Sequence, residues 1–131
     1  MGKQHYQDLI VWRKAMALVL DIYRVSKRWP ADEVYGLTGQ VRRAAVSIPA
    51  NVAEGQGRTG SKEFLHHLSI ANGSLYEVET HLILARDLSY LDEQVCDTLL
   101  RQAAEIGRLL NGLIRSLRAA GYRLAIVSNW S

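Results

Sequence analysis

The stretch that decides the fold reads Ala44-Ala45-Val46-Ser47-Ile48-Pro49-Ala50-Asn51-Val52-Ala53-Glu54-Gly55. It is a helix of small residues interrupted by a proline. Pro49 removes a backbone donor and clashes with the preceding turn, so we expect a kink or break near Ile48. Gly55, Gly57 and Gly60 follow within a few residues. They predict a flexible connection to the next helix.

Apolar residues recur at intervals of three and four along three longer segments, approximately 8–28, 61–88 and 92–118. This spacing predicts an amphipathic helix in each segment. The connections between the helices are short, which favours an all-α fold with an antiparallel up-down-up-down four-helix bundle, its second helix kinked at Pro49. We expect one bundle domain over residues 1–121. Residues 122–131 carry a β-like apolar run at 124–127 and are predicted to form an extended C-terminal tail.

The first helix carries two apolar series side by side. The first series is Leu9, Trp12, Met16, Val19 and Tyr23, and the second is Val11, Ala15, Leu18, Ile22 and Val25. One such series serves one neighbouring helix, so two series suggest two neighbours. We assign the second series, with Val11, Leu18, Ile22 and Val25, to contact with another subunit. A central position of this helix within a single bundle would also explain it.

Length and composition are those of a soluble globular domain. The chain has 131 residues, a net charge of +3 and a sequence pI near 9.2. This mildly basic balance permits an anionic partner without requiring one. Cys96 is the single cysteine, which excludes an intrachain disulfide and favours a reducing compartment. We find no signal-peptide pattern and no apolar run of membrane-spanning length, so we expect a cytoplasmic protein without membrane contact.

Basic residues form two groups that are candidates for contact with nucleic-acid phosphates. Arg101, Arg108 and Arg115 repeat every seven residues on the last helix, opposite its apolar series. The second group surrounds the proline-containing helix and its loop. The predicted contacts are Arg42, Arg43, Arg58, Lys62, Arg108 and Arg115. The alternative is an ordinary solvated face in which Glu105 pairs with Arg101 and Arg108 at helical spacing.

Polar residues near the proline are better explained by structure than by catalysis. Asn51 is expected to satisfy backbone groups that Pro49 leaves unpaired. Glu54 is expected to accept from the helix start at Ser61 or to pair with Arg43. The structural motif therefore comprises Ser47, Pro49, Asn51, Glu54 and Gly55.

No pattern indicates an active site or a cofactor. Glu63 with His67 and Glu77 with His81 are spaced by four residues on one helix. Di-iron bundles instead use Glu-x-x-His on two helices with further glutamates, so we predict no metal site. Cys96 lacks an adjacent histidine, and no phosphate-binding loop is present. We therefore predict a protein that is not an enzyme.

A longer pattern resembles a known family. It reads Leu9-x-x-Trp12, Tyr23, Trp29-Pro30, Glu33-x-Tyr35-Gly36-Leu37-Thr38-x-Gln40-x-Arg42-Arg43-Ala44-Ala45-x-Ser47-Ile48-Pro49-x-Asn51-x-Ala53-Glu54-Gly55, and then Ile70-Ala71-x-Gly73-Ser74-Leu75-x-Glu77-x-Glu79-Thr80. It is similar to the four-helix bundle proteins encoded within intervening sequences of bacterial 23S rRNA genes. The resemblance implies a ring-shaped homopentamer without catalytic activity. The accessory variability determinant of diversity-generating retroelements is also similar, which implies association with a reverse transcriptase and with nucleic acid.

Taken with this resemblance, the residues predict a non-enzymatic oligomeric protein that binds RNA or DNA phosphates through a basic surface. The expected partners are further copies of the chain as a homopentamer, RNA or DNA, and a reverse transcriptase or other protein. The alternative is a protein-interaction scaffold that binds no nucleic acid.

Overall fold

A computed structural model describes residues 5–58 and 60–130, with the backbone alone for 122–130. It contains four α-helices: α1 (Ile10–Ser26), α2 (Leu37–Gln56), α3 (Ser61–Asp87) and α4 (Glu93–Trp130). Two single turns of 3₁₀ helix, η1 (Tyr6–Asp8) and η2 (Ala31–Glu33), precede α1 and α2. The described residues include no β-strand. The all-helical prediction is thereby confirmed.

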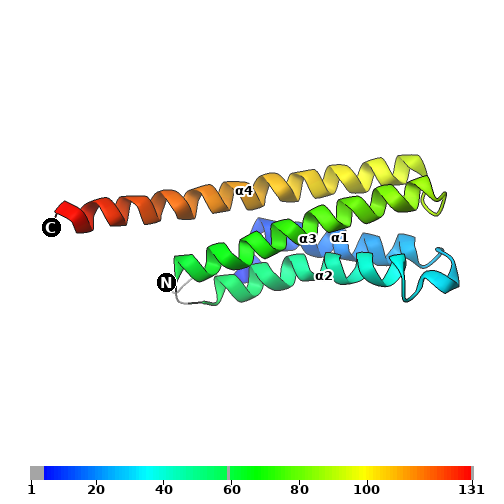
Figure 1. The fold of residues 1–131 in the computed structure, drawn as a ribbon, viewed down its shortest axis with the longest axis horizontal. Helices are drawn as coiled ribbons and strands as arrows, with labels where there is room; N and C mark the ends of the chain where they lie inside the picture. The colour runs from blue at the N-terminus through cyan, green and yellow to red at the C-terminus, as the bar shows by residue number, and fades with distance from the viewer. Residues whose placement is uncertain (1–4, 59, 131) are drawn as a thin grey trace.

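The four helices enclose one core. Helix α1 packs against α2 and α4, and α3 packs against the same two helices. Figure 1 places the α1–α2 and α3–α4 connections at one end of the molecule and the α2–α3 connection at the other. In the same view, α4 extends well beyond the ends of the other three helices. No helix in the described part of the chain is both long and apolar enough to cross a membrane.

The apolar series of α3 forms the middle of the core, as its regular spacing predicts. Leu68, Leu75 and Leu82 are each at most 2% exposed. Burying a leucine side chain stabilises the fold by about 1.5–3 kcal/mol. Core side chains from all four helices surround this series, among them Ile22, Val41, Ile48 and Ile106.

The proline does not interrupt α2, which runs continuously from Leu37 to Gln56 with Pro49 inside it. The break expected near Ile48 is therefore absent, and a bend at this residue stays a prediction. A proline within a helix costs about 3 kcal/mol. Ile48, Pro49 and Val52 are all buried, and their burial offsets a cost of that size.

The second apolar series of α1 is intrachain core, which corrects its assignment to a subunit interface. Leu18 is 1% exposed and Ile22 is 0% exposed within the single chain. Val11 is buried as well, and Val25 is half-buried against the core. The two series of α1 have the same spacing, so periodicity alone does not distinguish the face that packs inward. The apolar side chains that α1 exposes are instead Ile10, Leu20 and Tyr23.

The last helix is longer than its sequence pattern predicts. It continues past Gly121 to Trp130 and contains 38 residues, which corresponds to about 57 Å. The extended conformation expected after Gly121 is wrong for residues 122–130, whereas Ser131 lies outside the described residues. A single glycine costs a helix only about 1 kcal/mol, and no proline follows to stop it.

Among α1, α3 and α4, only α4 begins with a side-chain cap. Asp92 caps α4 as expected for an aspartate in that position, because its Oδ2 accepts from the backbone N–H of Gln94 at 3.1 Å. In contrast, α1 begins after Leu9 and α3 begins after Gly60, both without a side-chain cap. Asp8 instead forms an ion pair with Arg13, at 3.6 Å.

Candidate nucleic-acid-binding surface

The outer face of α4 presents a row of exposed arginines: Arg101, Arg108, Arg115 and Arg118. The one acidic residue between the first and last of these, Glu105, binds Lys14 of α1, with its Oε1 2.9 Å from Nζ. The alternative of an ordinary solvated face assumed that Glu105 pairs with Arg101 and Arg108. The structure pairs Glu105 with Lys14 instead. No ion pair of these four arginines occurs among the described residues. We call these four residues the α4 arginine row.

Arg42 is held by its own chain. Its Nε donates to Ser26 Oγ at 2.9 Å, and its Nη2 donates to the backbone carbonyl of Tyr23 at 3.4 Å. The guanidinium carbon lies 4.6 Å from the centroid of the Tyr23 ring, a distance at which the cation is attracted to the ring. Arg42 thus ties α2 to the last turn of α1, and two of its three nitrogens already have acceptors.

The other predicted basic residues do not form a single patch with Arg42. Arg43 is exposed and lines a hollow between α2 and α3 with Gln40 and Glu77. Arg58 and Lys62 flank the α2–α3 connection, at the opposite end of the bundle from the start of α2 (Figure 1). Arg58 Nη2 lies 2.7 Å from Glu54 Oε1. The structure brings Arg108 and Arg115 together with Arg101 and Arg118 and leaves the rest dispersed.

The motif around the proline makes a polar network between α2 and α3. Asn51 Nδ2 donates to the Ser47 carbonyl at 2.8 Å and to Ser47 Oγ at 3.0 Å, while Asn51 Oδ1 lies 3.0 Å from His67 Nδ1. Ser74 Oγ donates to Ser47 Oγ at 2.9 Å. These bonds fix the register of two helices, so a structural role fits the geometry.

Two details of that motif differ from expectation. The carbonyl that loses its helical donor at Pro49 is that of the residue four positions earlier, Ala45. Asn51 instead binds the carbonyl of Ser47. Glu54 pairs with Arg58, two residues past the end of α2, rather than with Arg43 or the start of α3.

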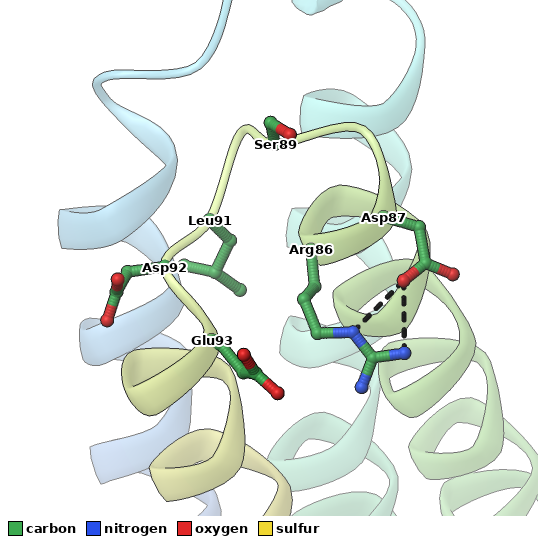
Figure 2. A pocket seen from close by; sticks show the side chains of 6 residues that line it. All are labelled: Arg86, Asp87, Ser89, Leu91, Asp92 and Glu93. Carbon is green, nitrogen blue, oxygen red and sulfur yellow. Dashed lines mark hydrogen bonds and ion pairs between the residues drawn. The ribbon is translucent and has the colours of Figure 1, made fainter.

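A hollow of about 840 Å³ lies at the α3–α4 connection. Its charged lining includes Arg86, Asp87, Asp92 and Glu93. Figure 2 shows that the carboxylates do not converge: Asp92 points away from Arg86, whereas Asp87 Oδ1 accepts from Arg86 Nε at 3.0 Å. Within the described residues, no group of three His, Cys, Asp or Glu side chains is arranged to hold a metal ion. The carboxylates of this hollow therefore do not form such a group.

Cys96 is buried, and His67 and His81 are half-buried. Burial raises the pKa of the Cys96 thiol, whose Sγ donates to the Leu82 carbonyl at 3.5 Å. A raised pKa disfavours the reactive thiolate at neutral pH. Burial also lowers the pKa of His81. His67 Nδ1 lies within hydrogen-bond distance of Asn51 Oδ1.

A feature that sequence reasoning missed is the exposed apolar face of α3. Tyr76 is 61% exposed, and Ile70, Ile83 and Leu84 of the same helix are also exposed. These side chains lie on the face opposite the core series. The signal available in the sequence was the seven-residue interval from Tyr76 to Ile83, which repeats out of phase with the Leu68–Leu75–Leu82 series.

Comparison with known proteins supports the fold and places the chain in a family. A crystal structure of a protein with unknown function from the S23 ribosomal protein family of Bacteroides thetaiotaomicron matches with a TM-score of 0.72 and 24% identity, covering 80% of this chain and 98% of that chain. No curated protein matches the sequence significantly. The sequence profile of the 23S rRNA-intervening sequence proteins matches residues 7–112, which include α1 to α3 and the first half of α4. The chain therefore belongs to the 23S rRNA-intervening sequence protein family.

Proposed function

We propose that this chain is a non-enzymatic accessory protein of the cytoplasm that self-associates and binds RNA or DNA through phosphate contacts. Its unit is an antiparallel up-down-up-down bundle, with α2 bent at Pro49. The observation that carries the proposal is the α4 arginine row, which is exposed and has no acidic partner in the described part of the chain. Arg43, Arg58 and Lys62 are peripheral contributors, whereas Arg42 serves the fold.

Phosphate binding by such a row depends on repetition. One exposed arginine contributes little against physiological salt, because its interaction with a distant charge is screened within about 8 Å. Successive seven-residue steps place Arg101, Arg108 and Arg115 roughly 10 Å apart along α4. Self-association would multiply the row and sum its field. Nucleic-acid affinity should then fall steeply as salt rises, because each neutralised phosphate releases counterions.

The decisive variant is Arg108→Glu with Arg115→Glu. Binding to structured RNA and to duplex DNA is measured across a salt series, with helicity followed by circular dichroism. We expect affinity to collapse, and any residual binding to show a salt slope reduced by about 2 for each chain that lost two phosphate contacts. The matched control, Arg24→Glu with Arg28→Glu, makes the same charge change on exposed residues of α1 and its C-terminal connection. Binding that survives the α4 change as well as it survives the control overturns the proposal.

A second candidate function is a protein-interaction scaffold that binds no nucleic acid. The exposed apolar face of α3 favours it, because Tyr76, Ile83 and Leu84 extend over about two turns of one helix. A second copy of the chain, a reverse transcriptase or another protein could cover such a face. Light scattering on Tyr76→Asp with Ile83→Asp separates the cases. A fall in particle mass assigns the face to self-association, whereas an unchanged mass leaves it free for a different protein.

A further inference from the structure

The apolar series of α4 continues past the end of the bundle. Its first four members, Leu99, Ala103, Ile106 and Leu110, are at most 3% exposed and belong to the core. Burial then falls along the helix, and α4 extends beyond the other three helices at this end (Figure 1). We call residues 113–130 the α4 overhang. Alternating steps of three and four residues continue there without a miss, through Leu113, Leu117, Ala120, Leu124 and Val127.

An apolar hollow of about 500 Å³ lies at the base of the overhang, where α1 begins. Leu9 and Ile10 line it from the start of α1, and Leu109, Leu113 and Ser116 line it from α4. Because α1 begins level with this part of α4, the side of α4 that α1 covers within the bundle is open from the hollow onward. The hollow and the series of the overhang share Leu113, so they form one continuous apolar surface.

The pattern of the overhang is that of a helix that packs against another helix. A series restricted to steps of three and four is the narrow seam of a coiled coil. Charged residues beside such a seam select a different chain as partner, but only one of the five flanking residues here is charged. The five are Ile114, Ser116, Gly121, Arg123 and Ser128. A seam with neutral flanks fits an identical seam, which favours a second copy of this chain as the occupant.

The position of the seam restricts how the second copy can approach. Within the bundle, the same series of α4 faces the core, and α1 packs against α4 there. The seam of the overhang therefore lies beyond the start of α1, along the line that α1 occupies. A parallel partner would bring its own α4 into the space of α1. An antiparallel partner comes from the opposite direction and ends where α1 begins, so it leaves both bundles intact.

We propose that the overhangs of two copies pair antiparallel through this seam and that the tip of each one fills the hollow of the other. Pairing Ala120 with Leu124 sets a small side chain against a large one. This register brings residue 130 level with residue 114, next to the hollow. Residues 116 and 130 are two heptads apart and share one face of α4, so the hollow receives Trp130 of the partner subunit.

The size of such an interface is adequate for a stable dimer. A stable interface buries about 1,200 Å² or more in total. An aromatic side chain buries about 150–250 Å², so the two copies of Trp130 would contribute roughly 300–500 Å². The seam residues and the exposed side chain of Ile10, which is 62% exposed in the single chain, add to this area.

This association site goes beyond the function proposed above and does not depend on it. The overhang lies outside residues 7–112, which match the family profile, and Arg101, Arg108 and Arg115 lie outside the seam. From residue 106 to residue 131 the chain contains four arginines and no aspartate or glutamate. Two overhangs therefore repel each other, and screening by salt should tighten their pairing. Binding to nucleic-acid phosphates should weaken under the same change, so the two proposals fail in different measurements.

Sedimentation equilibrium of the full chain at low and high salt measures the pairing. Leu124→Asp with Val127→Asp places charges in the seam, and the matched control, Ala125→Asp with Asn129→Asp, makes the same charge change on the other side of the helix. We expect the seam variant to have half the particle mass of the wild type and of the control, with the thermal unfolding of the bundle retained. Equal masses of the seam variant and the wild type overturn the proposal.

Introduced cysteines test the orientation. Ala120→Cys and Leu124→Cys chains are mixed in a glutathione redox buffer; the natural Cys96 is buried. We expect the mixed disulfide between the two variants to exceed either product of identical chains severalfold. A predominant disulfide between two Leu124→Cys chains would indicate parallel pairing and contradict the proposed arrangement.

The contact between the tip and the hollow is tested from both sides. Trp130→Ala and Ile10→Asp should each weaken dimerisation about tenfold or more, because tryptophans at interface centres contribute strongly to binding. Since both changes remove one contact, the double variant should bind about as tightly as the weaker single variant. Full affinity in either single variant, or fully additive losses in the double variant, would place Trp130 outside the hollow and overturn this part of the proposal.

Discussion

The Tyr90 hydroxyl donates to Glu33 Oε2 at 2.9 Å and thereby joins the α3–α4 connection to the α1–α2 connection. The other oxygen of the same carboxylate, Oε1, accepts from the backbone N–H of Leu37 at 3.1 Å and so caps α2. The rings of Trp29 and Tyr90 lie 6.2 Å apart between centroids. One side chain, Glu33, therefore joins the start of α2 to the α3–α4 connection at this end of the bundle.

Alkaline pH should weaken this arrangement. The hydrogen bond to Glu33, with lesser contributions from burial and nearby carboxylates, raises the pKa of Tyr90. A raised folded-state pKa stabilises the fold below the unfolded value near 10, and the contribution is lost as pH rises through the folded value. Urea unfolding between pH 7 and 11 should show an alkaline loss of stability that Tyr90→Phe reduces. The exposed Tyr35→Phe is the control, and identical pH dependence in both variants would contradict the role of Glu33.

Ser89→Gly should stabilise the protein. Ser89 has a positive φ of 63°, and it ends α3 with a Schellman pair, Tyr90 N–H to the Ala85 carbonyl at 2.8 Å and Ser89 N–H to the Arg86 carbonyl at 3.0 Å. The left-handed conformation costs a residue with a Cβ about 1–2 kcal/mol. We expect a gain of about 1 kcal/mol in the free energy of unfolding. Ser69→Gly, on the exposed face of α3, should lower it instead.

Gly55 and Gly73 should respond oppositely to alanine. A Cβ at Gly55 would lie 2.7 Å from His67 Cβ and 2.9 Å from Phe64 Cδ1, whereas a Cβ at Gly73 meets nothing within 4 Å. Overpacking costs about 1–3 kcal/mol, and replacing glycine within a helix gains about 1 kcal/mol. In thermal and urea unfolding, Gly73→Ala should be more stable than the wild type. The free energy of unfolding of Gly55→Ala should be about 1–3 kcal/mol lower than that of Gly73→Ala. Equal stability of the two variants would show that α2 and α3 separate easily there.

The corrected position of the second α1 series changes what its disruption should do. Leu18 is 1% exposed, whereas Leu20 on the same helix is 51% exposed. Leu18→Ala should cost about 2–5 kcal/mol, because it leaves a cavity in the core. Leu18→Asp should unfold the chain rather than yield folded monomers.

The control for that experiment is Leu20→Asp, which should change the stability by no more than about 1 kcal/mol. Circular dichroism and light scattering on the same samples separate unfolding from dissociation. A folded Leu18→Asp monomer would contradict the intrachain position of this series and support its assignment to a subunit interface.

The sequence by itself determined that the chain is helical, where α1 and α3 lie and where α4 begins, and which face of α3 is buried. These features follow from local periodicity, because one apolar face repeats every 3.6 residues and the core series of α3 has no misses. The sequence also identified the family, through a motif at residues 44–55 whose Asn51, Ser47 and Gly55 join α2 to α3.

Where two interpretations fitted the same local sequence pattern, only the tertiary structure decided between them. The two apolar series on α1 have the same spacing, so the positions of α2 and α4 decide which of them is buried in the core. Glu105 lies at helical spacing from Arg101 and Arg108, yet it forms its ion pair with Lys14 of α1. The α4 arginine row is therefore left without this acidic partner. Long-range packing sets which polar groups are paired, and sequence spacing does not contain that information.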